Sequence, residues 1–135
     1  MNTEDVKEWL TIAEDDFDSA KILNDAAKKH FEITCYLCAQ SAEKYLKGYL
    51  IYCDIVPQKT HNLLFLNNLC VEKDNNFEKI QTLCNFLNRF ANDIRYPHKY
   101  EVSEDAANFA IAAVEKIRNI KPIKDLESLV ATYDV

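Results

Sequence analysis

The residue types with the widest chemical repertoire gather in two short polar segments. One is Arg95-Tyr-Pro-His-Lys-Tyr100, where Arg95, His98 and Lys99 stand with two tyrosines around a proline. Cationic donors beside aromatic faces suit a nucleotide or an RNA, because phosphates pair with the cations and bases stack on the rings. An ordinary helix cap has the same composition when Arg95 binds carbonyl oxygens at a helix end. The residues alone leave both interpretations open.

The second polar segment is Pro57-Gln-Lys-Thr-His61, and it follows an apolar stretch that carries Lys44 and Lys47. The two lysines are three residues apart, so they share one helical face; a solvated stripe beside a buried helix gives the same pattern. His61 can titrate near neutral pH. It also follows a typical capping residue, Thr60, and can simply hydrogen-bond at a helix start.

Other catalytic patterns find little support in the sequence. We find no Gly-rich phosphate loop, no paired acid and histidine spacing for a metal, and no Ser-His-Asp arrangement, so we predict no metal site and no cofactor. Cys35 and Cys38 form a CxxC without a second pair, inside an apolar helical pattern, which favours a role in the core. Five cysteines are an odd count, and we expect reduced thiols.

The acidity of the chain is confined to one end. The formal charge is −6, yet seven of the 22 acidic side chains and only one of the 16 basic ones precede Ser19, so the remainder is balanced. Broad coating of nucleic acid is therefore disfavoured, whereas a small local phosphate site stays possible. The acids of this first segment are a candidate surface for a basic partner.

The composition predicts an all-α protein. One glycine and three prolines in 135 residues are too few turn formers for a many-stranded sheet. Apolar residues recurring every three or four positions predict an up-and-down bundle of about five helices, four long and one short. Their expected ranges are 3 to about 28, 31 to about 53, 61 to about 71, 77 to about 94, and 103 to about 121.

Several local features accompany this expectation. We predict Thr3, Thr60 and Ser103 as helix N-caps, and residues 72–76 as a polar connection. The second helix should be central, and its Gly48 indicates a close approach by another backbone. The expected domain is a single bundle over residues 1–122, and residues 123–135 form a tail or a short helix.

The expected location is the cytoplasm. No stretch reaches about 18 uncharged apolar residues, and the acidic N-terminus lacks the basic start and apolar run of a signal peptide. We therefore expect a soluble, cytoplasmic protein that has no membrane contact.

Four motifs then occur in a distinctive order: Trp9-x-x-x-Ala13-x-x-Asp16, the string Cys-Tyr-Leu-Cys-Ala-Gln-Ser-Ala-Glu-Lys-Tyr-Leu-Lys-Gly-Tyr-Leu at 35–50, Pro57-x-Lys59-Thr60-His61-x-Leu63, and Arg95-Tyr96-Pro97. Together they resemble the HEPN domain, a family named for higher eukaryotes and prokaryotes and for nucleotide binding. The resemblance covers about residues 4 to 120. It implies a helical bundle that forms a homodimer, and a minimal nucleotidyltransferase as partner, often in a toxin-antitoxin system.

Many HEPN proteins are metal-independent RNases, in which an Arg is followed after four to six residues by a His. Here eight residues separate Arg89 from His98, and two separate Arg95 from His98. The sequence instead resembles the branch that carries Arg-Tyr-Pro.

The resemblance implies candidate ligand contacts for a nucleotide or an RNA at five positions: Lys47, Lys59, His61, Arg95 and Tyr96. An alternative is an RNase toxin, in which His98 moves protons and Arg95 stabilises the phosphoryl charge. A second alternative is a non-catalytic adaptor that only makes protein contacts.

Overall fold

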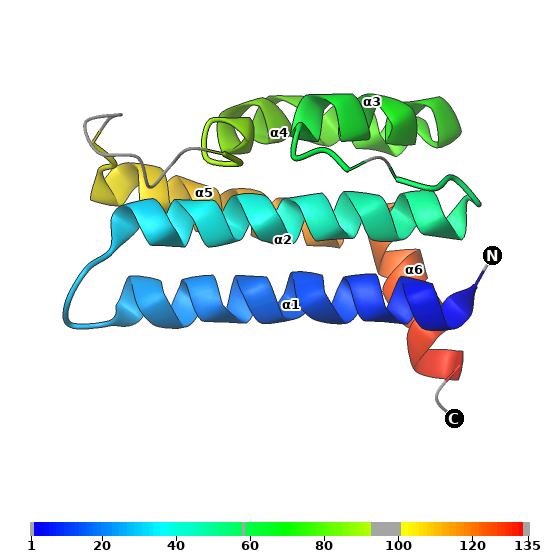
Figure 1. Cartoon of the computed structure of the whole chain (residues 1–135), viewed down its shortest axis with the longest axis horizontal. Helices are drawn as coiled ribbons and strands as arrows, with labels where there is room; N and C mark the ends of the chain where they lie inside the picture. The colour runs from blue at the N-terminus through cyan, green and yellow to red at the C-terminus, as the bar shows by residue number, and fades with distance from the viewer. Residues whose placement is uncertain (1, 58, 93–100, 134–135) are drawn as a thin grey trace.

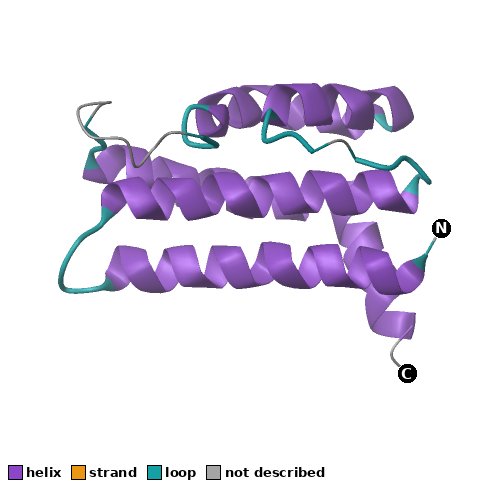
Figure 2. Ribbon diagram, in the orientation of Figure 1, coloured by secondary structure: helices purple, strands orange, loops and turns teal. Residues whose placement is uncertain are grey.

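The computed structural model describes residues 2–57, 59–92 and 101–133, and these residues form helices joined by loops (Figures 1 and 2). No strand occurs in the described part of the chain, so the predicted all-α class is confirmed. The helices are α1 (Thr3–Asp25), α2 (Phe31–Tyr52), α3 (Leu63–Lys73), the 3-10 helix η1 (Asn75–Ile80), α4 (Gln81–Asn88), α5 (Glu104–Asn119) and α6 (Lys121–Tyr133).

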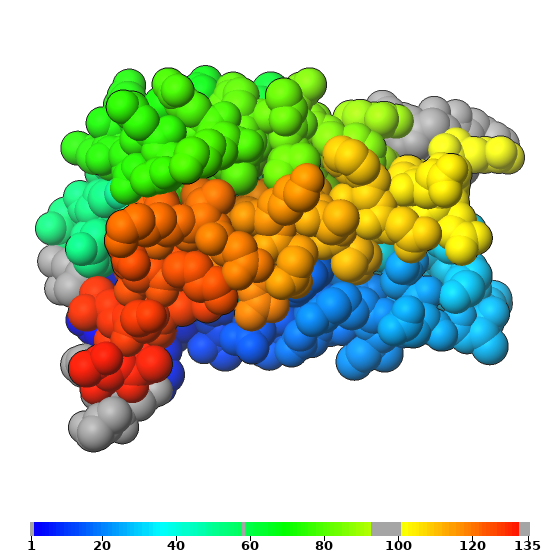
Figure 3. All heavy atoms as spheres, turned by 180° about the vertical axis from the view of Figure 1, so that it is seen from behind, coloured from blue at the N-terminus to red at the C-terminus, as the bar shows by residue number. Residues whose placement is uncertain are grey.

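The helix α2 is the centre of the bundle, as predicted. It runs antiparallel to α1 and also contacts α3, α4, α5 and α6 (Figure 1). Seen from behind, α5 lies between the α3 and α4 layer and α1 (Figure 3). Because α2 is covered on so many sides, most of its residues from Thr34 to Leu50 are buried.

The helix α1 shows why the apolar pattern predicts helices well and their ends less well. Its buried residues follow each other at intervals of three and four: Val6, Leu10, Ala13, Phe17 and Ala20. The N-cap is Asn2 rather than the predicted Thr3, because the Asn2 side chain accepts hydrogen bonds from the backbone N–H groups of Glu4 and Asp5. The helix ends at Asp25, before the predicted residue 28, and Ala27 is exposed.

Gly48 packs against Trp9 and Leu10 of α1. A Cβ atom at this position would lie 3.2 Å from the Cβ of Trp9 and 3.4 Å from Leu10 Cδ2. The predicted close approach is therefore made by the side chains of α1 rather than by its backbone. A glycine lets the two helices pack at this distance.

The start of α3 differs from the prediction. Asn62, not Thr60, is its N-cap, and its Oδ1 accepts from the backbone N–H groups of Leu64 and Phe65 at 3.1 Å. Thr60 lies two residues before this cap, outside the helix, and its Oγ1 accepts a hydrogen bond from the Asn62 backbone N–H at 3.1 Å. The helix accordingly spans Leu63–Lys73 rather than residues 61–71.

The expected fourth helix, 77 to about 94, is divided in the structure. Part of the predicted connection 72–76 is helical, and Asp74 caps η1 through a 2.9 Å bond from the Asn76 N–H. Side chains three apart align in a 3-10 helix, so Phe77 and Ile80 both reach the core. The helix α4 then ends at Asn88, and the expected end at residue 94 lies outside the described residues.

The last two helices complete the bundle. Ser103 caps α5 as predicted, with its Oγ accepting from the Ala106 N–H at 3.1 Å. The expected tail forms α6, which begins at Lys121 and buries Ile123 and Leu126, so the predicted boundary at residue 122 falls in its first turn. The expected fourth helix is divided and the expected tail is helical, so the described residues form more helices than the five expected.

The cysteines belong to the core. Cys35 and Cys38 are fully buried, which confirms the core role predicted for the CxxC pair. Burial raises the pKa of the Cys35 thiol to about 12 and raises that of Cys38 further. In the described residues, no group of three or more His, Cys, Asp or Glu side chains is placed to hold a metal ion. Of the helices in the same ranges, none combines the length and apolar character needed to cross a membrane.

Candidate functional site

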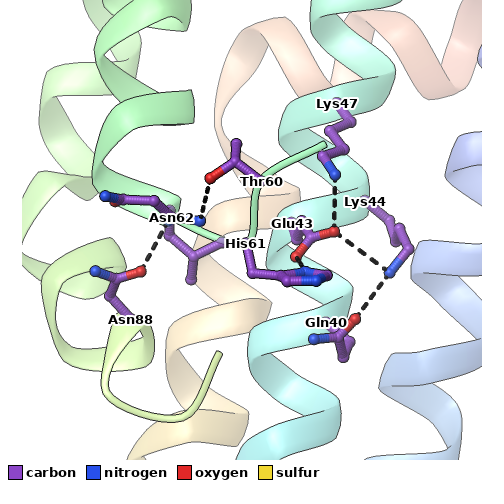
Figure 4. A network of polar contacts seen from close by, with 9 residues as sticks. Gln40, Glu43, Lys44, Lys47, Thr60, His61, Asn62 and Asn88 are labelled. Carbon is purple, nitrogen blue, oxygen red and sulfur yellow. Dashed lines mark hydrogen bonds and ion pairs between the residues drawn. The ribbon is translucent and has the colours of Figure 1, made fainter. Parts of the chain in front are cut away.

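A buried carboxylate on α2 gathers the charged side chains that the sequence had singled out. Glu43 is only 2 % exposed, and its Oε2 accepts from Lys47 Nζ at 3.0 Å. The other oxygen, Oε1, lies 2.8 Å from Nδ1 of His61. Lys44 Nζ is 3.8 Å from Oε2. Figure 4 shows this group, called here the Glu43 cluster and made up of Gln40, Glu43, Lys44, Lys47 and His61.

Helical spacing explains why four of these residues meet. Positions 40, 43, 44 and 47 are three and four apart, so they share one face of α2. A further hydrogen bond links side chains of this face, because Lys44 Nζ donates to Gln40 Oε1 at 3.0 Å. The spacing along α2 therefore brings together every member of the Glu43 cluster except the histidine.

The loop before α3 supplies the histidine. This loop returns along α2 after the helix has ended, and it brings His61 over Glu43 (Figures 1 and 4). It is held at the next residues, because Asn62 caps α3 and the Leu63 N–H donates to Asn88 Oδ1 at 2.8 Å. His61 is thus anchored both by α2 and by the start of α3.

The helix α1 closes the other side of the cluster. Lys47 Nζ lies 5.8 Å from the centre of the Trp9 ring, a distance at which a cation is attracted to the ring face. Asp16 also faces the cluster: burial raises the pKa of its carboxyl, and the nearby Lys44 ammonium opposes this rise. The cluster therefore lies at the seam between α1 and α2.

The charges of the cluster balance only when Asp16 is counted. Glu43 faces the ammonium groups of Lys44 and Lys47, and the Asp16 carboxylate near Lys44 offsets the second ammonium, so a net positive charge arises when His61 is protonated. The side chains differ in access: Lys47 is 8 % exposed, Lys44 18 % and His61 54 %. Lys47 is therefore committed to the carboxylate, whereas His61 and, to a lesser extent, Lys44 face solvent.

These positions decide among the earlier interpretations. Lys47 is buried in an ion pair, so a solvated stripe is wrong for that residue. His61 binds Glu43 through its ring instead of only serving a helix start. Lys59 is exposed, two residues before His61. Arg95, Tyr96 and His98 lie outside the described residues.

Sequence reasoning missed Glu43 as the centre of the site. The signal was present, because Glu43 precedes Lys47 by four residues within an apolar helix, the spacing that favours an ion pair. An acid and a base at that spacing are exposed on most helices. Only the coverage of α2 by α1 and by the loop before α3 makes this pair buried.

Arg89 marks a second group of cationic and aromatic side chains. Its guanidinium lies 5.7 Å from the Phe86 ring centre and 5.3 Å from that of Phe90. Phe86 in turn meets Phe109 of α5 edge to face, with ring centres 4.6 Å apart. This group joins α4 to α5 at the end of α4 that leads to the polar segment 95–100.

Comparisons with known proteins agree on the fold. The family model described as HEPN domain matches residues 6–126. The crystal structure of ST0689, an archaeal HEPN homologue, is similar with 23% identity and a TM-score of 0.66, covering 93% of this chain and 97% of that one.

A second solved structure, that of TT1696 from Thermus thermophilus, has 20% identity and a TM-score of 0.76, covering 93% of this chain and 99% of that one. At these identities the two likenesses establish the fold. No curated protein matches the sequence.

Proposed function

The chain belongs to the HEPN domain family, and on that premise we propose that it binds a nucleotide or an RNA at a cationic site beside Glu43. The proposed contacts are Lys44, Lys59 and His61, with Arg95 and Tyr96 of the Arg-Tyr-Pro segment. The ligand's phosphate pairs with the cations, and a base stacks on an aromatic ring. Lys47 contributes indirectly, by holding the carboxylate that orients His61.

One observation carries this proposal: a buried glutamate holds two lysines and a histidine, Lys44, Lys47 and His61, together in one place. A fixed cluster loses little side-chain entropy when a phosphate arrives, unlike free surface lysines. The glutamate also keeps the His61 ring in one orientation, with Nδ1 toward Glu43 and the other ring nitrogen available to a ligand.

The proposed partner is a minimal nucleotidyltransferase, in a system of the toxin-antitoxin type, and the proposed assembly is a homodimer. Family membership and the Arg-Tyr-Pro motif support both ideas. The direct test is to look for a minimal nucleotidyltransferase gene beside this one and to co-express the two proteins. We expect a stable complex that survives gel filtration, and separate elution of the two proteins would contradict the partnership.

Trp9 offers a direct readout for the binding site, because it is the sole tryptophan and its ring lies near Lys47. We expect ATP or a short single-stranded RNA to change its fluorescence saturably, with affinity falling as salt rises. Lys44→Gln and His61→Gln should each weaken binding about fivefold, the effect of losing roughly one phosphate contact.

Lys116→Gln is the matched control, since it removes the same charge from an exposed position on α5. If Lys116→Gln weakened binding equally, the loss of affinity would come from overall charge, and the proposed site would be wrong. The same RNA, recovered afterwards, tests the nuclease alternative: cleavage that His98→Ala abolishes would favour the RNase.

A further inference from the structure

A pocket of about 310 Å³ opens at the end of the bundle where α2 stops. Its walls come from the last turns of α2, from Asp74 between α3 and η1, and from the first turns of α6, which crosses this end in Figure 1. The volume is at the lower end of the range for small-molecule sites. None of its residues belongs to the Glu43 cluster.

Aromatic and apolar side chains form most of the surface of this pocket. The rings of Tyr49 and Tyr52 stand 6.0 Å apart between centres on the α2 side, and the inner one, Tyr49, is fixed against Phe77 at 4.6 Å. Leu126 and Leu129 of α6 form the facing wall. A short apolar stem would therefore be covered on both sides.

Two carboxylates, Asp74 and Asp125, give the pocket its charge. One of the two, Asp125, already pairs with a cation outside the lining of the pocket: Lys121 Nζ donates to Asp125 Oδ2 at 2.8 Å while the lysine side chain remains 75 % exposed. The pKa of Lys121 is raised, mainly by this hydrogen bond to Asp125 and in part by Asp74, so both acids act on the same ammonium.

The local structure leaves acceptor capacity for a second cation. The two hydrogen bonds that Asp74 accepts from Asn76 both fall on Oδ1. The carboxyl-terminal ends of α2 and α3 lie at this pocket, but so do the amino-terminal ends of η1 and α6, and Lys73 is in the last turn of α3, so the helix ends give the pocket no clear charge of their own. The negative charge of the pocket therefore comes from its two carboxylates, and the exposed Lys121 offsets one of them.

We propose that this pocket binds an organic cation, namely a guanidinium or alkylammonium group on a short apolar stem. The cation pairs with Asp125 and Asp74 and lies against the tyrosine rings, which attract positive charge to their faces. The stem packs between the tyrosines and the leucines of α6. Lys121 is the internal competitor that the ligand displaces from Asp125.

The first test uses butylguanidinium as the probe and butylurea as its neutral isostere, in a two-dimensional amide NMR titration of the full chain. We expect saturable shifts at Tyr52, Asp125 and Leu129 with butylguanidinium, at least about tenfold weaker or absent with butylurea. No saturable shift at these residues, or equal binding of the urea, would overturn the proposal.

Variants separate recognition of the cation from general charge effects. Asp125→Asn should weaken butylguanidinium binding about fivefold, and Lys121→Gln should strengthen it about threefold because the competitor is gone. Asp18→Asn is the matched control, since Asp18 forms a comparable exposed pair with Lys21 on α1. Weakening by Asp18→Asn equal to that by Asp125→Asn, or no gain from Lys121→Gln, would count against the pocket.

A peptide experiment distinguishes two sources of the cation, a basic side chain of a protein partner and a free small molecule. An acetylated, amidated pentapeptide with one central arginine and flanking alanines is compared with its citrulline counterpart. Binding about tenfold tighter than butylguanidinium would identify a basic side chain of a protein partner, and weaker binding would identify a free small cation. Because the pocket and the Glu43 cluster share no residue, loss of nucleotide binding in the earlier experiment leaves this result unaffected.

Discussion

The Nδ1 atom of His61 lies 2.8 Å from Oε1 of Glu43, so the loop before α3 is tied to the centre of α2. The same carboxylate accepts from Lys47 through its other oxygen. Glu43 thus links a loop residue 18 positions away with a lysine one helical turn further along α2. The only accessible member of this chain of contacts, His61, is the one positioned to meet a ligand.

Replacing Glu43 by glutamine should destabilise the protein by about 3 kcal/mol. The Lys47 ammonium would remain buried without its counter-charge, which is the costly outcome when one member of a buried ion pair is removed. Urea unfolding followed by circular dichroism measures the change in the free energy of unfolding.

The double variant Glu43→Gln with Lys47→Met is the control for this loss. Methionine keeps much of the lysine stem without the charge, so the double variant should be more stable than Glu43→Gln alone by about 2 kcal/mol. A double variant no more stable than the single one would show that the ion pair is not the cause.

The fold could be predicted from the sequence because its main signal is local. The buried residues of α1 recur every three or four positions, and such a stripe identifies a helix without knowledge of its neighbours. Helix ends are different. Asn2 and Thr3, or Thr60 and Asn62, are competing caps, and the choice depends on where packing against the rest of the bundle lets the helix begin.

The Glu43 cluster was only partly predictable for a related reason. Lys47 and His61 were identified by their motifs, but the carboxylate that joins them was not. The bond between Glu43 and His61 depends on the return of the loop along α2, a long-range arrangement that helical spacing does not encode. Burial of Lys47 likewise depends on α1, whose Trp9 contacts it.

Asp16→Asn should stabilise the folded protein near neutral pH. Burial raises the pKa of Asp16 in the folded state above its ordinary value, so the folded chain loses stability as the pH rises from the ordinary value through the raised one. Asparagine removes this cost. The melting temperature of the variant should therefore exceed that of the wild type at about pH 7 and approach it near about pH 2.5, well below the ordinary pKa, where the carboxyl is protonated in both states.

Asp15→Asn is the comparison for that effect, because it removes the same charge at an exposed position of α1. Relief of general repulsion in the acidic helix would affect both variants equally. Only a larger gain for Asp16→Asn at neutral pH supports the burial argument, and equal gains would contradict it.

Cys53 should be the one cysteine that reacts quickly with Ellman's reagent in the native protein. The other four are buried, and burial holds the pKa of Cys35 at about 12, so almost no thiolate is present at about pH 8. We expect about one fast equivalent in the native state and all five in denaturant. Cys53→Ser should abolish the fast phase, and fast reaction that persists in this variant would contradict the described core.

Gly48→Ala should destabilise the protein although alanine is the better helix former. Helix propensity alone favours alanine by about 1 kcal/mol. The new Cβ, however, would lie 3.2 Å from the Cβ of Trp9, an atom fixed directly to the backbone of α1, so the helices must move apart. Overpacking of this kind costs about 1 to 3 kcal/mol, which exceeds the propensity gain through most of that range.

The background variant Trp9→Ala separates the two parts of the tryptophan. Alanine keeps the Cβ and removes the indole, so the cost of Gly48→Ala should persist in that background if the Cβ contact is responsible. Urea unfolding of the four proteins gives both free-energy differences. If the Gly48→Ala protein were more stable than the wild type by about 1 kcal/mol, α1 would be able to move away from α2 at no measurable cost. The Glu43 cluster, which lies at the same seam, would then rest on a looser contact than its short distances indicate.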